Sequence, residues 1–264
     1  MSEITLQELG VALPPTQDEL PCNDGIPMET QRHKVQMNLL INSLLPWLDK
    51  RSDGYASGNM FVYFSLAQVR NQDFRGPDFF AVLGVPKKER KSWVVWEEGK
   101  APDVVIELLS DSTAQADKNE KKLIYQNQLR VPEYFWFDPF NSDDWAGFYL
   151  QHGVYQPIMP NAQNQLVSHS LSLALQRWQG TYEGVEATWL RWATLDGEFL
   201  PTFEEQERQR AEQEYQRAEQ ERQRAEQAQS LLQQTVRNLL QEGMTVEQVA
   251  RLTGLSQIQV EEFR

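Results

Sequence analysis

The sequence predicts a mixed α/β (α+β) fold, in which helices pack on a mixed sheet, followed by a charged helical tail. Two observations predict this architecture. Up to about residue 200, a helical pattern is followed by strand-like apolar runs, a second helical pattern and further strands. After Pro201 the composition changes, and residues 204–229 are almost only Glu, Gln, Arg and Ala. We therefore expect a main domain at 1–200, a charged heptad-repeat helix at 201–236 and a helix-turn-helix-like module at 237–264.

The main domain is expected to begin with a helix at 29–48, because its apolar residues recur at helical spacing. This apolar face comprises Met37, Leu40, Ile41, Leu44, Leu45 and Leu48. Strands are expected at 60–66, 78–83, 92–97 and 104–109. A helix at 117–129 follows, with Leu123, Ile124 and Tyr125 as core contacts. Further strands are expected at 133–138, 146–150 and 154–158, whereas 171–178 and 187–192 fit a strand or a short helix.

The tail repeats with a period of seven residues, as EQERQRA (205–211), EQEYQRA (212–218), EQERQRA (219–225) and EQAQSLL (226–232). This composition strongly favours helix, and Glu–Arg pairs three residues apart support its surface. A coiled coil needs two apolar positions in each heptad. Ala211, Ala218 and Ala225 supply one position, and Tyr215 partly supplies the second. A weak coiled coil and a solvated single helix therefore both fit the pattern.

The last 28 residues predict two short helices. Gly243 is expected to end the preceding helix, and Thr245 with Gln248 forms a capping-box pattern. The expected apolar stripes are Val246, Val249 and Leu252, then Ile258, Val260 and Phe263. The second helix carries Glu261 and Glu262, whereas a helix that reads DNA bases usually offers Arg, Lys or Asn. A module for protein contact or self-association is the better interpretation.

Composition limits the possible compartments and partners. Cys22 is the single cysteine, so neither an intrachain disulfide nor a cysteine zinc site is possible. The N-terminus has no secretory pattern, and no apolar run has transmembrane length, so we expect a cytoplasmic protein without a membrane partner. The net charge of −13 disfavours nucleic acid as a partner, although a bound divalent metal can reverse the sign locally.

An ionisable residue interrupts the expected strand at 104–109. Asp103, Val105 and Glu107 share one face of this strand, and an unpaired charge at Glu107 would be costly in a core. Asp78 begins an earlier strand after Gly76 and Pro77. If the two strands are neighbours, Asp78 and Glu107 converge and repel each other unless a cation lies between them. Two carboxylates suit Mg²⁺ or Mn²⁺, which keep several waters.

The helix that follows carries Lys118, Lys121 and Lys122. A lysine reaching back over the metal would complete a site for phosphodiester hydrolysis. The metal would activate water and hold a phosphate oxygen, and the ammonium would stabilise the nucleophile or the developing negative charge.

Four motifs in this order resemble the Uma-two family: GPDFF, PDVVIELLSDST, DKNEKKLIY and VPEYFWFDP. This bacterial family is assigned as restriction endonucleases of the PD-(D/E)XK nuclease superfamily. The match covers roughly 20–160, and the tail lies outside it. The resemblance implies a restriction-endonuclease-like core with Asp78 and Glu107 as metal-binding carboxylates. The superfamily's lysine normally lies two residues after the glutamate, where Leu109 stands here. In this family the lysine is moved to the following helix, where Lys121 matches best and Lys122 is second. The resemblance also makes Glu29 a candidate metal ligand.

Structural interpretations remain open beside these. Asp78 could cap a turn, Glu107 could belong to a buried ion pair, and Lys121 could be solvated surface. Asp103 and Asp138 are expected to end loops and strands, and His33 to be a helix-start or supporting residue. The preferred function is a Mg²⁺-dependent endonuclease acting on DNA, in a chain that forms at least a dimer through its C-terminal helices. The alternative is a catalytically weak or inactive nuclease fold that serves as an interaction module.

Overall fold

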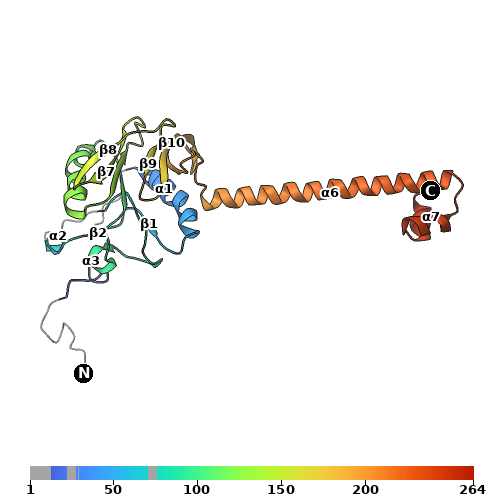
Figure 1. Cartoon of the computed structure of the whole chain (residues 1–264), viewed down its shortest axis with the longest axis horizontal. Helices are drawn as coiled ribbons and strands as arrows, with labels where there is room; N and C mark the ends of the chain where they lie inside the picture. Colours follow the sequence, from blue (N-terminus) through green and yellow to red (C-terminus); the bar gives the residue numbers. More distant parts are fainter. Residues whose placement is uncertain (1–12, 23–27, 29, 71–75) are drawn as a thin grey trace, which may run out of the picture. The chain divides into compact units, whose positions relative to one another are not determined.

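The computed structural model describes residues 13–22, 28, 30–70 and 76–264, and its contacts divide the chain into two compact units (Figure 1). The first unit comprises Met1–Phe203 and the second Glu204–Arg264. Glu29 lies outside the described residues, so its predicted metal contact stays a prediction.

A six-stranded mixed sheet with the order β1-β3-β5-β6-β7-β8 is the framework of the first unit. The strands are β1 (Tyr55–Ser57), β3 (Phe79–Val82), β5 (Val104–Leu108), β6 (Glu133–Phe137), β7 (Trp145–Gln151) and β8 (Val154–Ile158). β5 and β6 run parallel, and the other neighbouring pairs are antiparallel. The mixed sheet with packed helices confirms the predicted fold class.

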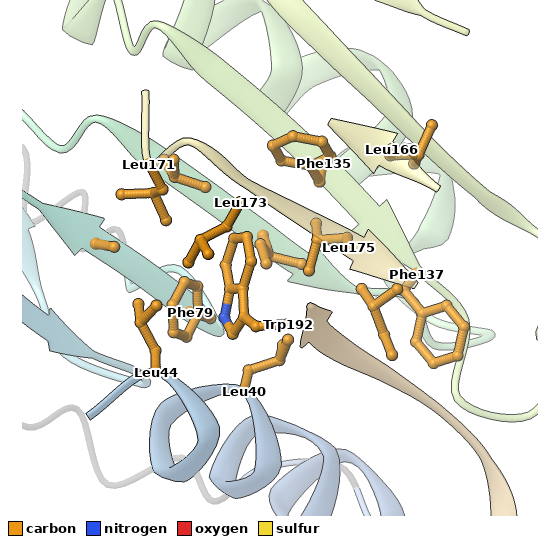
Figure 2. Close-up of a cluster of buried hydrophobic side chains, with 14 of the residues drawn as sticks. Leu40, Leu44, Phe79, Phe135, Phe137, Leu166, Leu171, Leu173, Leu175 and Trp192 are labelled. Atoms are coloured by element: carbon orange, nitrogen blue, oxygen red, sulfur yellow. The ribbon is translucent and has the colours of Figure 1, made fainter. Parts of the chain in front are cut away.

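One face of this sheet packs against α1 (Gln31–Asp49) and an antiparallel three-stranded sheet. The small sheet consists of β9 (Leu166–Ser168), β10 (Leu173–Tyr182) and β11 (Val185–Ala193). Figure 2 shows how the side chains of Leu40 and Leu44 meet Phe79 and Trp192 in this core. β5 contributes Val104, Ile106 and Leu108 to the same cluster, so its alternate residues face the other side of the sheet.

A helical segment covers that other side and contains two stretches of π-helix. It runs through α4 (Ala114–Ala116), η1 (Asp117–Lys121), α5 (Lys122–Ile124) and η2 (Tyr125–Leu129). Asp117, Tyr125 and Leu129 are buried, and Lys121 is partly buried. These residues are spaced by four. In an α-helix of 3.6 residues per turn such a series drifts around the axis, whereas i→i+5 bonding widens the turn and keeps the series on one face.

The predicted core contact of Leu123 is wrong, because this side chain is 53% exposed. The prediction assumed that three consecutive residues of the helix would reach the core. Tyr125 is buried and Ile124 partly packed, but Leu123 lies two residues before Tyr125 and therefore on the opposite side of the helix, away from the sheet.

Other elements differ from the predicted ranges. The segment 60–66 forms the two-residue β2 (Val62–Tyr63) and enters α2 (Leu66–Arg70). Within 92–97, β4 (Trp93–Val94) pairs with β2 and gives way to α3 (Val95–Glu98). The ambiguous segments near 171–178 and 187–192 are strands β10 and β11. β1 and β9 were not predicted; each has three residues, too few to show a period.

The second unit contains most of α6 (Phe203–Gln241), with α7 (Val246–Thr253) and α8 (Gln257–Glu262). The predicted capping box of Thr245 and Gln248 is confirmed. Val236, Val249 and Val260 form a small buried cluster. Leu252 and Ile258, predicted to join the apolar stripes, are 63% and 72% exposed, because two short helices can bury little besides one valine each.

Along α6, residues 204–230 are almost entirely exposed, and the pairs Glu207–Arg210 and Glu219–Arg222 form surface ion pairs. Such pairs contribute little to stability. No helix in the described part of the chain is long and apolar enough to cross a bilayer.

Candidate active site

Glu107 points from β5 into the face covered by the helical segment, and it is 1% exposed. Its carboxylate has two partners from that segment. Tyr125 donates its hydroxyl to Oε1 at 2.8 Å, and the Lys121 ammonium donates to Oε2 at 3.1 Å. The charged group inside a core strand is therefore paired, which reduces the cost of its burial.

Asp78 stands at the start of β3, beside the end of β5. Phe79 pairs with Ile106 in the antiparallel ladder, which places Asp78 across from Glu107. The backbone N–H of Leu108 donates to Asp78 Oδ2 at 2.7 Å. A close backbone approach supports this position, because a Cβ on Gly58 would lie 2.2 Å from the carbonyl oxygen of Asp78. The two predicted carboxylates thus meet at one point of the sheet.

The Lys121 ammonium lies between two buried carboxylates. Besides Glu107 it contacts Asp117 Oδ1 at 2.6 Å, and Asp117 is fully buried. Neither carboxylate oxygen of Asp117 has a hydrogen-bond partner among the described residues, so its contact with Lys121 is an ion pair. The backbone carbonyl of Asp117 accepts from the Tyr134 hydroxyl at 2.8 Å, which fixes η1 to β6.

Burial and charge act in opposite directions on these groups. Burial raises the pKa of Glu107, and the charge of Lys121 only partly offsets this effect. Burial alone would lower the pKa of Lys121, but the carboxylates of Glu107 and Asp117 outweigh it, so that pKa lies above its usual value. Asp78 contributes to the same shift, which places its charge within electrostatic reach of the ammonium. The two carboxylates therefore favour the protonated form of Lys121.

The residues fit a divalent cation, although no three acidic, His or Cys side chains among the described residues are arranged to hold one alone. Mg²⁺ is usually held by one or two carboxylates and keeps several waters, which Asp78 and Glu107 can satisfy. Asp78, Glu107, Asp117 and Lys121 together carry a formal charge of −2, which one divalent cation would balance. The buried, unpaired Oδ2 of Asp117 is consistent with this deficit of positive charge.

The other candidates lie elsewhere. Lys122 places its ammonium over the ring of Phe148, 3.3 Å from the ring centroid, and not against Glu107. Asp103 accepts from Leu83 N at 2.7 Å and from Lys100 at 2.8 Å, so it anchors a loop. Asp138 accepts from the backbone N–H groups of Phe140 and Asn141 and closes a turn.

His33 is buried in the first turn of α1, and its Nε2 donates to the carbonyl of Leu109 at 2.9 Å. It therefore ties α1 to the end of β5, as expected of a supporting residue. A cavity of about 370 Å³ opens beside this contact and is lined by His33, Leu109 and Ser110, among others. It adjoins the strand end that carries Glu107, but none of Asp78, Glu107 or Lys121 lines it.

Asp117 and Tyr125 are members of the site that the sequence did not reveal as such. Both lie four residues from Lys121, one before and one after, and this spacing is the signal that could have identified them. The signal was weak because four-residue spacing marks a common helix face only approximately.

The first unit therefore has a mixed α+β fold, and carboxylates and a lysine meet near the end of β5. The chain belongs to the Uma2 (Uma-two) family, described as "Putative restriction endonuclease", whose match spans residues 19–183. A solved structure described as that of a putative nuclease from Anabaena variabilis is similar at 18% identity and a TM-score of 0.39. That similarity covers 57% of this chain and 88% of the other. No curated protein matches the chain.

Proposed function

We propose that the protein is a Mg²⁺- or Mn²⁺-dependent endonuclease that hydrolyses phosphodiester bonds in DNA. One observation carries the proposal. The buried carboxylate of Glu107 forms an ion pair with Lys121, and a second carboxylate, Asp78, lies on the neighbouring strand beside it. Buried titratable groups with charged partners are typical of functional sites. The family description supports DNA as the substrate class.

Each residue has a role that follows from its surroundings. Asp78 and Glu107 would hold the cation, because they provide the hard oxygen ligands that it prefers. When bound, the cation supplies activation of water and compensation of charge on the phosphate. Lys121 stays protonated beside them and stabilises the negative charge that develops on the phosphate.

Cleavage of supercoiled plasmid and of labelled single- and double-stranded oligonucleotides tests the proposal, with Mg²⁺, with Mn²⁺ and with a chelator. Asp78→Ala and Glu107→Gln should each lower the rate by about 100-fold or more, as for loss of a major electrostatic contribution. Asp49→Ala is the matched control, since this carboxylate is exposed and pairs with Lys87 at the surface. A wild type that neither binds divalent cations in calorimetry nor cuts any substrate would leave the fold as an interaction module.

We also propose that the chain is at least a dimer, assembled through its C-terminal helices. The support is a set of large apolar side chains that are exposed in the second unit: Leu252, Ile258, and Tyr215 and Leu231 on α6. Two copies would bring two sites to the two strands of a duplex.

A further inference from the structure

Asp117 has no part in the function proposed above, yet its carboxyl group is fully buried and contacts Lys121. Its Oδ1 contacts the Lys121 ammonium at 2.6 Å, which is shorter than the 3.1 Å between that ammonium and Glu107. Neither of its oxygens has a hydrogen bond among the described residues, so the ion pair with Lys121 is its polar side-chain contact there. Burying a carboxylate in such a position lowers the stability of the fold, so a functional role for it is worth seeking.

The contact between Lys121 and Glu107 suggests what this role is. Glu107 Oε2 accepts from Lys121, so a cation that binds this carboxylate competes with the ammonium. Glu107 Oε1 is already occupied by Tyr125. Without a second partner, the ammonium displaced by the cation would move into solvent, because its side chain is 26% exposed.

We propose that Asp117 is a positioning residue, which holds the Lys121 ammonium beside the phosphodiester site when a divalent cation engages Glu107. The inference rests on the proposed function. Asp117 and Lys121 lie four residues apart within η1, so the pair is internal to one helical turn and does not depend on β5. Tyr134 fixes the backbone of Asp117 to β6, which keeps the carboxylate in place while the contact to Glu107 changes.

The widened helix supports this assignment independently. π-helical turns are uncommon and often mark functional sites. Here they bring Asp117, Lys121 and Tyr125 onto the face that meets Glu107. The helical segment therefore places the Lys121 ammonium in contact with both carboxylates, Glu107 and Asp117.

Lysine acetylation followed by peptide mass spectrometry tests the proposal, with and without saturating Mn²⁺ at one pH. In the wild type, Lys121 should stay protected in both conditions. In Asp117→Asn, addition of Mn²⁺ should raise the acetylation rate of Lys121 about tenfold or more, because the displaced ammonium then has no charged partner to hold it. Lys118 is the internal control, because it lies on the same segment and pairs with Asp144.

Two further measurements belong to the same experiment. At saturating Mn²⁺, Asp117→Asn should lower kcat about tenfold and leave KM for DNA unchanged, and Asp117→Glu should recover part of the loss. The double variant Asp117→Asn/Lys121→Met should be no slower than Lys121→Met alone, because Asp117 acts through Lys121. If thermal unfolding shows that Asp117→Asn is not folded, Asp117→Ser replaces it.

The possible failures are distinguishable. If calorimetry shows that the wild type binds Mn²⁺ but Lys121 stays protected in the Mn²⁺-loaded asparagine variant, the positioning role is wrong and the proposed function stands. If Asp117→Asn abolishes Mn²⁺ binding in the Lys121→Met background as well, Asp117 is a metal ligand and the inference is overturned. If the wild type binds no cation, the proposed function fails and the positioning role fails with it.

Discussion

Glu107 is a residue whose proposed role in metal binding lowers the stability of the fold. The side chain lies between apolar neighbours on a core strand, and burial raises the pKa of its carboxyl. A group with a raised pKa in the folded protein favours folding at low pH, below its pKa in the unfolded chain. That contribution is lost as the pH rises through the folded pKa. The ionised form of Glu107 is therefore a cost to stability, which the cation is expected to relieve.

Glu107→Gln should consequently be more stable than the wild type in chelator at pH 8, by about 2–4 °C in Tm for each kcal/mol recovered in a domain of this size. The difference should shrink as the pH falls toward 4, where the wild-type carboxyl is also neutral. Mn²⁺ should raise the Tm of the wild type and not that of the variant. Calorimetric scans at both pH values measure this, and a variant that unfolds earlier than the wild type at pH 8 would mean a structural role for Glu107.

Lys121 and Lys122 are neighbours in sequence but differ in their surroundings. Lys121 contacts two carboxylates, whereas Lys122 lies over Phe148 and Trp136. Lys121→Met should therefore lower kcat for DNA cleavage by about 100-fold, while Lys122→Met should change it less than about threefold. Single-turnover cleavage at saturating Mn²⁺ makes the comparison, and a larger effect at Lys122 would reverse the assignment.

At the scale of elements, the site depends on how closely β1 approaches the start of β3. Gly58 follows β1, and the backbone of Asn59 donates to the carbonyl of Pro77 at 3.0 Å. This approach leaves no room for a Cβ on Gly58, because the obstacle is the backbone oxygen of Asp78.

Gly58→Ala should displace Asp78, with a loss of about 1–3 kcal/mol in the free energy of unfolding. The affinity for Mn²⁺ should fall with it. Gly84→Ala is the control: Gly84 has a φ of +73°, so alanine is strained there, but no atom lies within 4 Å of its Cβ. That variant should lose stability and keep its Mn²⁺ affinity in calorimetry. Equal affinities in both variants would show that Asp78 is not positioned by this contact.

The elements also show what the sequence could predict. The strand at 104–109 and its buried glutamate were predictable, because an apolar β-branched run with one charge has few interpretations. Lys121 was selected through the family resemblance, and the structure places it against Glu107. The widened turns of η1 and η2 have no signature in a sequence pattern that assumes α-helical spacing. Asp117 was missed because its four-residue spacing from Lys121 marks a common helix face only approximately.

For the whole molecule, the net charge of −13 conflicts with a nucleic acid partner unless positive charge is local. Lys118 and Lys121 are already paired with carboxylates, so a bound cation would be the main source of positive charge at the site. The tail (residues 204–264) has 12 Glu and 8 Arg, a net charge of −4, so most of the negative charge lies in the first unit, which contains the candidate site. Affinity for DNA should therefore be modest and steeply dependent on salt.

The tail offers a test of assembly. A seam of alanines buries about one methyl group per heptad, and each contributes less than about 1 kcal/mol. Leu252 and Ile258 are larger and exposed, so α7 and α8 should contribute more to self-association than the heptads. Leu252→Ser/Ile258→Ser should shift the protein toward monomer, whereas Ala211→Ser/Ala218→Ser should change the association less. Sedimentation across a micromolar concentration series decides, and a wild type that stays monomeric throughout would leave the tail as a spacer or as a contact for another protein.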